Sequence, residues 1–416
     1  MRPGHIRSLA FGATAALVLG ATSGGTGASS PKAVEPKPMP TDARTDVRLE
    51  PVPYRELTGW QVDDHAAALK AFLKSCDRLL AAVKGGAFTG KAAPSPALLV
   101  ACEDAAKLAP RKLKAAAART FFEASFTPHR VVHPGTPGLL TAYYEPLIDG
   151  SRTPTDRFKT PIYRRPPDLV NLVDDAMRGA VGSTLTHARQ TPAGLVAFAT
   201  RAEIEEGALA GQGLELAYVA DPVEAFFLQI QGSGQIRLAD GSTFRVAYAG
   251  KNGHPYSSIG RHLVETGLFP ADKMSMDSLA SWLRADPARG RKVMWHNASY
   301  VFFRELTGEQ AKSTIGVNEI PLTAGRSLAV DAGVHVIGAP IYVSASELGH
   351  IVPGGFHRLM IAQDVGSAIK GPERGDIFMG SGAAAGRAAS ITRHPGRFFV
   401  LVPRGPEIAV PAGAAP

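Results

Sequence analysis

Three aspartates in the C-terminal part of the chain stand beside glycine and next to short apolar runs. Asp364 is followed by Gly366, Asp376 comes directly after Gly375, and Asp331 ends the apolar run that precedes it. Carboxylates at strand edges can act as general acids or bases, and a neighbouring glycine lets a polymer backbone approach closely. Taken singly, each aspartate is equally consistent with a turn former that bonds its own backbone.

Signatures of several other kinds of active site are missing from the sequence. There is no Gly-x-Ser-x-Gly elbow, no Walker loop and no His-Glu-x-x-His. The segment 232–234 (GSG) lacks the third glycine of a dinucleotide fingerprint. The 12 histidines do not fall at metal-ligand spacings, and a metal shared by His254 and His262 is the weaker alternative. We therefore expect no cofactor and no metal.

Several further stretches carry a more specific pattern. Together with the aspartate segments, they resemble the membrane-bound lytic murein transglycosylase A family, whose catalytic part contains the three-aspartate domain. The resemblance covers about residues 140–400 and is looser before residue 138. The matching stretches are 141–146 (TAYYEP), 161–167 (PIYRRPP), 229–234 (QIQGSG), 248–256 (YAGKNGHPY) and 297–303 (NASYVFF).

The resemblance implies an α+β fold that is mainly β. It consists of a double-psi β-barrel domain, an inserted smaller β-domain, and a groove between them for a glycan strand. On this chain we expect the catalytic domain, with N-terminal helices, to comprise residues 54–146 and 268–406. The inserted β-domain is then expected over residues 147–267.

The resemblance also implies an exotransglycosylase, a polysaccharide lyase of the EC 4.2.2.n1 type. Such an enzyme cleaves the MurNAc-GlcNAc β-1,4 bond of peptidoglycan and leaves 1,6-anhydro-MurNAc ends. Glycosidases usually need two carboxylates, whereas attack by the sugar's own O6 needs only one acid that later acts as base. The resemblance assigns the role of this acid to Asp376, and it assigns supporting roles to Asp364 and Asp331. The acid must start protonated, so burial or a neighbouring Asp364 should raise its pKa.

The remaining motif residues suit substrate holding. Tyrosines offer stacking surfaces for sugar rings, with ordinary core packing as the alternative. Gln229 and Gln231 alternate on one face of a predicted strand, which favours a lined groove. Lys370 either binds a carboxylate, restrains an aspartate or is simply solvated, and Arg326 is expected to brace Asp331. The predicted substrate-binding residues are Tyr143, Tyr144, Gln229, Gln231, Ser233, Lys251, Asn252, Tyr256 and Lys370.

Two other functions remain as alternatives. One is a peptidoglycan-binding module that grips the glycan without cutting it, and the intact aspartate segments argue against it. The other is a glycosidase that adds water and leaves a reducing end, where a transglycosylase leaves an anhydro ring.

Charge and the N-terminus point to an exported protein with an anionic partner. The 416 residues carry a net charge of +8, but the basic residues are scattered, so we expect peptidoglycan glycan strands rather than nucleic acid. Arg2 and Arg7 precede an apolar stretch and then small residues, which predicts an export signal over 1–28 and a linker over 29–53. No cysteine follows for a lipid anchor, so we expect a periplasmic protein, with peripheral outer-membrane or cell-wall association left open.

The elements that must position these residues follow from hydrophobic spacing and from 44 glycines and 32 prolines. Helical spacing predicts three N-terminal helices, and a disulfide between Cys76 and Cys102 would tie two of them, unless both are buried thiols. The predicted helices are 63–82, 96–108, 111–122, 257–266 and 278–285. The predicted strands are 139–144, 162–164, 195–199, 215–219, 225–231, 235–238, 243–248, 327–330, 340–344, 359–363, 376–378 and 398–401. Residues 239–242 (ADGS), between two of these strands, predict a hairpin turn.

Overall fold

The computed structural model describes residues 47–86, 94–108, 114–135, 137–172, 175–179, 181 and 184–405. The predicted export signal, 1–28, lies outside the described residues, as does most of the predicted linker, 29–53. The end of that linker is a strand, β1 (Arg48–Pro51), which pairs antiparallel with β2 (Phe126–Val132).

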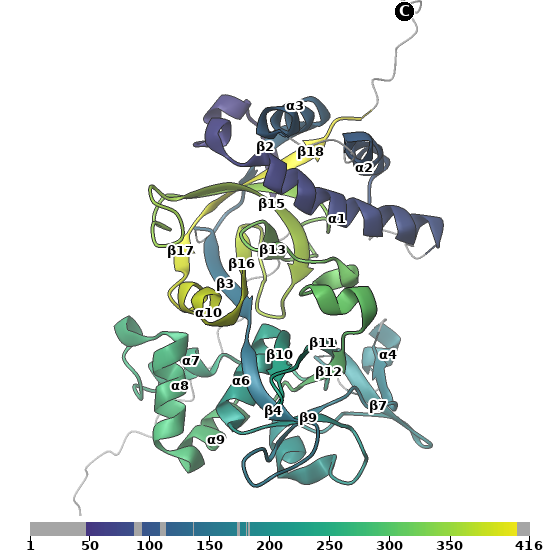
Figure 1. Ribbon diagram of the computed structural model, residues 1–416, viewed down its shortest axis with the longest axis vertical. Helices are drawn as coiled ribbons and strands as arrows, with labels where there is room; N and C mark the ends of the chain where they lie inside the picture. The colour runs from purple at the N-terminus through teal and green to yellow at the C-terminus, as the bar shows by residue number, and fades with distance from the viewer. Residues whose placement is uncertain are drawn as a thin grey trace, which may run out of the picture. The chain divides into compact units, whose positions relative to one another are not determined.

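In the described part of the chain, the largest sheet has nine strands and contains all three aspartate segments (Figure 1). It is mixed, because β13 pairs parallel with β15, and β16 pairs parallel with β3, while the other ladders are antiparallel. The strands in spatial order are β1, β2, β18 (Arg397–Pro403), β14 (Pro340–Ala345), β15 (Phe356–Val365), β13 (Ser327–Val330), β16 (Arg374–Ser381), β3 (Leu139–Glu145) and β17 (Arg393–Pro395).

The three predicted N-terminal helices are confirmed as α1 (His65–Lys84), α2 (Pro96–Leu108) and α3 (Ala115–Ser125). Asp64 caps α1, since its carboxylate accepts the backbone N–H of Ala67 at 3.0 Å. The apolar faces of these helices share one core with residues of β15 and β18, and this core includes the buried rings of Phe72 and Phe122. The helical unit is therefore packed on the large sheet.

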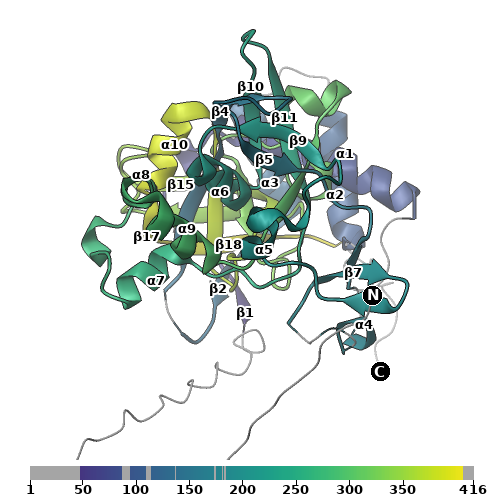
Figure 2. The same cartoon turned by 90° about the horizontal axis from the view of Figure 1, so that it is seen from below.

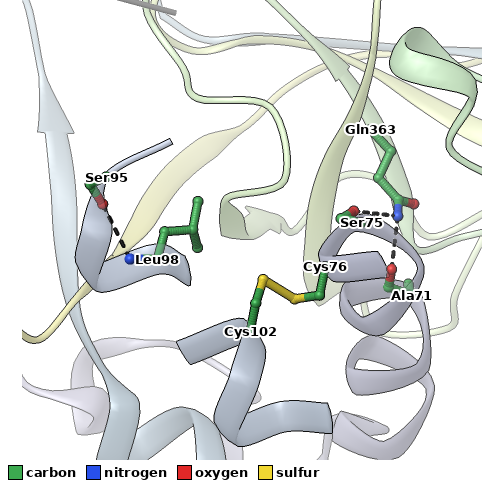
Figure 3. Close-up of a disulfide and its surroundings, with 7 residues drawn as sticks. All are labelled: Ala71, Ser75, Cys76, Ser95, Leu98, Cys102 and Gln363. Atoms are coloured by element: carbon green, nitrogen blue, oxygen red, sulfur yellow. Dashed lines mark hydrogen bonds between the residues drawn. A yellow bond between two sulfur atoms is a disulfide. The ribbon is translucent and has the colours of Figure 1, made fainter. Parts of the chain in front are cut away.

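Cys76 of α1 and Cys102 of α2 form a disulfide, which confirms the predicted bridge between two helices (Figure 3). One turn of α1 nearby also receives the buried side chain of Gln363 from β15. The Gln363 amide donates to the Ala71 carbonyl and to the Ser75 hydroxyl, both at 2.8 Å. The helix that the disulfide holds is thus also hydrogen-bonded to the strand that ends in Asp364 and Val365.

A second, six-stranded sheet and a small three-stranded sheet form the other part of the described chain. The predicted hairpin 239–242 joins two of its strands, and Asp240 closes it by accepting the backbone N–H of Ser242 at 2.9 Å. The six strands in spatial order are β12 (Val301–Glu305), β11 (Thr243–Lys251), β10 (Ser233–Arg237), β4 (Leu147–Ser151), β9 (Glu215–Val219) and β5 (Thr160–Tyr163). The three-stranded sheet contains β6 (Leu169–Asn171), β7 (His187–Thr191) and β8 (Gly194–Val196).

The predicted strand 225–231 is wrong, because this segment is the helix α6 (Pro222–Gln231). Asp221 caps it, Pro222 occupies its first turn, and Gly232 ends it in a left-handed conformation with φ of 77°. The capping residues lie outside the apolar run, which by itself fits either kind of element.

Helices α6, α8 (Met276–Ala285) and α9 (Pro287–Trp295) share an apolar cluster with α7 (Ile259–Glu265). Figure 2 shows where these four helices run. The described ranges also contain the α-helices α4 (Asp175–Gly179), α5 (Arg201–Glu203) and α10 (Gly382–Ser390) and several single-turn helices. The described fold is thus mixed helix and sheet, and mostly sheet, as the sequence predicts. No helix in the described ranges combines the length and the apolar character that a membrane crossing requires.

Candidate active site

Strand pairing brings Asp376 and Asp364 onto one face of the nine-stranded sheet. Ala329 of β13 lies opposite Asp364 on one side and opposite Asp376 on the other. With strands about 4.8 Å apart, two residues that flank the same strand have Cα atoms roughly 10 Å apart. Between them lies the small side chain of Ala329, which is buried and packs in a cluster with Tyr143 and Phe378.

Asp376 is held through one oxygen only. The Thr141 hydroxyl, opposite it on β3, donates to Oδ1 at 2.5 Å, and Arg374 Nη2 donates to that hydroxyl at 2.8 Å. Since a threonine hydroxyl has one hydrogen, the bond from Arg374 directs that hydrogen to Asp376. In the described part of the chain, Oδ2 of Asp376 accepts no hydrogen bond.

Burial raises the pKa of Asp376 above its ordinary value, while the Thr141 hydrogen bond and the Arg374 charge oppose the rise. The net direction is upward, because desolvation of the charged form is the largest of these influences. A carboxyl group with this pKa direction and one oxygen without a partner is suited to donating a proton.

Asp364 has a raised pKa but a different set of partners. The Tyr143 hydroxyl donates to its Oδ2 at 2.8 Å, and the Val365 backbone N–H donates to its Oδ1 at 2.9 Å. Burial raises the pKa of Asp364 to about 6, against these donors, and the negative charge of Asp376 adds to the rise. Both oxygens of Asp364 are thus occupied, whereas Asp376 keeps one oxygen open.

Asp331, the third aspartate, is bonded to backbone groups and stabilises a loop. It is buried and accepts the backbone N–H groups of Gly333 and Gly371, both at 3.0 Å. Lys370 lies 3.5 Å from its Oδ1, so Asp331 holds the loop between β15 and β16. The expectation that Arg326 braces Asp331 is wrong, because Arg326 pairs with Asp63 at 2.7 Å and 2.9 Å.

Gly375, directly before Asp376, supports the core rather than the approach of a polymer. A Cβ atom there would lie 2.7 Å from the Phe398 ring and 3.0 Å from Leu328. The residue is therefore glycine because the opposite face of β16 packs too closely for any side chain. The tight packing fixes the strand position at the residue that bears the carboxyl group.

The tyrosines predicted to hold sugars fall into different places. Tyr143 is buried beneath the site, between Asp364 and the Phe378 ring, whose centroid is 5.3 Å from its own. Tyr144 packs against Gly386 of α10, and its N–H donates to Gln231 Oε1 at 3.0 Å. Tyr256, in the segment after β11, lies near enough to Asp376 that the aspartate's charge adds to a rise in its pKa caused mainly by burial.

The predicted pairing of Gln229 and Gln231 on one strand face does not occur, because both lie on α6. Gln231 reaches β3 through Tyr144, whereas Gln229 is buried and contacts the Tyr300 side chain. Ser233 is also buried, at the start of β10. Two residues apart on a helix point in different directions, so the alternation argument does not hold for this segment.

Asn252 is buried, and its amide is already bonded to the backbone. It donates to the carbonyls of Ala199 and Ala298 at 2.8 Å and 2.9 Å and accepts the N–H of Tyr300 at 2.9 Å. It therefore joins three segments around β12 and is not open to a ligand. Lys251, its neighbour, lies half-buried with its ammonium 3.4 Å from the Ser367 hydroxyl.

Glu145, at the end of β3, connects the two large sheets. It is buried and accepts Gln235 Nε2 at 2.6 Å, Arg245 Nε at 3.1 Å and the Ser381 hydroxyl at 2.6 Å. Gln235 and Arg245 belong to the six-stranded sheet, and Ser381 belongs to β16. The carboxylate thus fixes the six-stranded sheet against the strand that carries Asp376.

Thr141 and Arg374 were not among the predicted site residues. Thr141 opens a motif that the sequence singled out, and Arg374 lies two positions before Asp376. Alternation along a strand places residues two apart on the same face, which is a usable signal for Arg374. The pairing of Thr141 with Asp376 depends on the register of strands far apart in the sequence. Among the described residues, no cluster of three or more acidic, histidine or cysteine side chains is arranged to hold a metal.

Known proteins match the chain in both of its sheet regions. A model for the MltA specific insert domain matches residues 139–304, and a model for the 3D domain matches residues 326–402. The membrane-bound lytic murein transglycosylase A of Vibrio cholerae is 34% identical over 268 residues, which are 63% of this chain and 65% of that relative. The matched region is thus just under two thirds of that relative's length.

Solved structures match over more of the chain. A membrane-bound lytic murein transglycosylase from Agrobacterium tumefaciens is 37% identical, with 86% of this chain and 98% of that chain covered and a TM-score of 0.77. MltA from Escherichia coli with bound chitohexaose is 26% identical, with 86% and 95% covered and a TM-score of 0.61.

Proposed function

The chain belongs to the membrane-bound lytic murein transglycosylase A family, and from this premise we propose that it is itself a lytic transglycosylase. The proposed reaction is cleavage of the β-1,4 bond between MurNAc and GlcNAc in peptidoglycan, with a 1,6-anhydro ring on the MurNAc product. The names of the relatives and the chitohexaose bound to the Escherichia coli enzyme support a β-1,4-linked amino-sugar strand as substrate.

The observation that carries the proposal is the state of Asp376. Its pKa is raised by burial, one oxygen is fixed by Thr141, and the other has no partner in the described chain. These are the properties of a general acid that starts protonated and faces a ligand. Asp364 is less suited to this role because donors occupy both of its oxygens.

The proposed reaction needs one proton carrier and no water. Asp376 gives its proton to the glycosidic oxygen as the bond from the MurNAc anomeric carbon to that oxygen breaks. The O6 hydroxyl of the same MurNAc then bonds to the anomeric carbon, and the Asp376 carboxylate takes the proton that O6 loses. The aspartate returns to its protonated form, so the cycle balances without a second catalytic carboxylate.

We assign positioning roles to the partners of the two aspartates. Thr141, directed by Arg374, orients the Asp376 carboxyl group without placing a cation in contact with it. Tyr143 fixes Asp364, and the negative charge of Asp376 adds to the raised pKa of Asp364, so the two carboxyl groups are electrostatically linked. Tyr256 lies on the side of the inserted domain and is proposed to contact the sugar next to the cleaved bond.

We also propose a domain organisation and a cellular location for the protein. We propose that the nine-stranded sheet contains the family's double-psi barrel and that the glycan binds between it and the inserted domain. We place the end of the insert after β12 rather than at residue 267, because β12 pairs with β11 and α8 and α9 share a core with α6. A periplasmic location, reached through the N-terminal signal, is proposed from the sequence of residues 1–28.

Mass spectrometry of the soluble fragments released from purified peptidoglycan tests the proposal. The wild-type protein should release fragments that end in 1,6-anhydro-MurNAc. Asp376→Asn should lower the rate about 10³-fold, the scale of general acid catalysis. The exposed Asp272→Asn, an equal change of charge, serves as the matched control and should retain the wild-type rate.

Each other outcome has a definite reading. Fragments with hydrated reducing ends would make the protein a hydrolase. An absence of fragments from the wild-type protein would favour a binding module without catalysis. Anhydro fragments released at an undiminished rate by Asp376→Asn, but lost in Asp364→Asn, would move the acid to Asp364.

A further inference from the structure

Cationic side chains from three segments gather beside the loop that follows Asp364. They are Lys251 at the end of β11, Lys370 in the loop between β15 and β16, and Arg165 in the segment between β5 and β6. The Lys251 ammonium lies 3.4 Å from the Ser367 hydroxyl, in the same loop as Lys370. The Arg165 side chain lies against Gly250, the residue before Lys251.

Little negative charge is available to offset these cations. Within the described chain, Lys251 has no carboxylate within ion-pairing distance, and Lys370 has only Asp331, at 3.5 Å. Asp331 also accepts two backbone N–H groups, so its charge is shared. Burial lowers the pKa of Lys251, and the positive charge of Lys370 lowers it further, as expected of a like charge close by.

Neighbouring polar groups do not supply the missing charge. Arg165 donates to the carbonyls of Ala249 and Leu169 and to the Asn171 side chain, at 2.8 to 3.0 Å, and all three acceptors are neutral. His187 is buried, and burial followed by the charges of Lys251 and Arg165 lowers its pKa to about 4. The histidine is therefore neutral near pH 7 and adds no further positive charge.

We propose that Lys251 and Lys370 form a carboxylate-binding subsite that recognises the acidic groups carried by the glycan strand. The ligand follows from the proposed function, but the charge arrangement is independent of it. A carboxylate between two ammonium groups forms charge-assisted hydrogen bonds, which neutral sugar hydroxyls cannot match. The subsite lies where the end of β11 meets the loop between Asp364 and Asp376, so binding there sets the register of the glycan over the candidate acid.

Peptidoglycan offers two sources of carboxylate. In strands with intact stem peptides, the lactyl group of MurNAc is bound in an amide and the free carboxylates belong to the peptide. In strands stripped of peptide by an amidase, the lactyl carboxylate itself is free. Chitohexaose has the same β-1,4-linked backbone without any carboxylate, and it provides the neutral reference.

Calorimetric binding to these three probes tests the subsite. The measurements use Asp376→Asn as background, so that no probe is cleaved. Adding Lys251→Met or Lys370→Met should weaken binding to one or both acidic strands about ten-fold, while chitohexaose affinity stays within about two-fold. Lys251→Arg should keep most of the affinity, and the exposed Lys292→Met on α9 is the matched control for loss of one positive charge.

The pattern of losses decides the outcome. A loss confined to stripped strands identifies the lactyl carboxylate, and a loss confined to intact strands identifies the peptide carboxylates. Equal weakening for all three probes, or no change for any, would overturn the subsite. The anhydro products of the wild-type protein are measured separately, so a failure of the proposed function is distinguished from a failure of the subsite.

Discussion

Two arginines of the nine-stranded sheet region interact with aspartates in different ways, one by direct contact and the other through a hydroxyl group. Arg326 contacts Asp63 directly, with two hydrogen bonds of 2.7 and 2.9 Å, and both side chains are at most 6% exposed. Arg374 instead reaches Asp376 only through the Thr141 hydroxyl. The first pair joins the segment before α1 to the large sheet, and the second set lies at the candidate active site.

The difference shows how one sheet can hold a structural carboxylate and a reactive one. Direct contact with a guanidinium favours the ionised form of a carboxyl group, which suits a structural ion pair and not an acid. A hydroxyl between arginine and aspartate preserves the orientation but weakens that electrostatic effect. Burial therefore remains the larger influence, and the pKa of Asp376 stays raised.

The largest expected effect is at the structural pair. Asp63→Asn leaves Arg326 buried with its charge uncompensated, and breaking such a pair costs about 3–5 kcal/mol of unfolding free energy. Denaturant unfolding of the variant, with Asp272→Asn as control, measures this loss. A loss equal to that of the exposed control would show that the direct pair is not the structural contact that its geometry indicates.

The disulfide should contribute somewhat less. It joins residues 26 apart, and replacing Cys76 and Cys102 together by alanine should cost about 3 kcal/mol of unfolding free energy. The bridge lies in the helical unit and not at Asp376, so the initial rate of anhydro product release, measured below the unfolding transition, should stay within about two-fold of wild type. A large loss of rate in protein that remains folded would connect the helices to the site more closely than the contacts suggest.

The smallest expected effect is at the mediated pair. Thr141→Val keeps the shape of the side chain but removes the hydrogen bond that holds Asp376, and the rate should fall about ten-fold. That hydrogen bond lowers the pKa of Asp376, so its removal should raise this pKa and extend the protonated form to higher pH. The alkaline limb of the rate profile should therefore move to higher pH.

A pH–rate profile of Thr141→Val, compared with that of the exposed Thr243→Val, provides this measurement. A purely structural role for Thr141 would lower the rate without moving the alkaline limb. A shift of that limb to lower pH would contradict the proposed arrangement of Arg374, Thr141 and Asp376.

The sequence predicted the positions of helices and strands more accurately than it predicted the contacts between side chains. Helical spacing located α1 and α2, and the turn residues Asp240 and Gly241 located the hairpin of the six-stranded sheet. The same approach failed for 225–231, where a short apolar run fits a buried helix as well as a strand. The cap at Asp221 and the αL glycine at Gly232 decided the outcome there.

The partners of the charged side chains could not be predicted, because they depend on strand register and on segments distant in the sequence. Arg326 lies close to Asp331 along the chain, yet its partner is Asp63. Asn252, predicted to bind substrate, instead uses its amide to join three backbone segments.

By itself, the sequence determined the family, the mainly β character and the aspartates that are candidates for chemistry, since these follow from residue type, order and local spacing. Only the tertiary structure decided how those aspartates differ. Opposition across β13 brings Asp364 and Asp376 together, and Asp331 is turned to the loop of Lys370. The physical reason is that burial and hydrogen-bond partners set the pKa of a carboxyl group, and both come from strands that meet only in the folded chain.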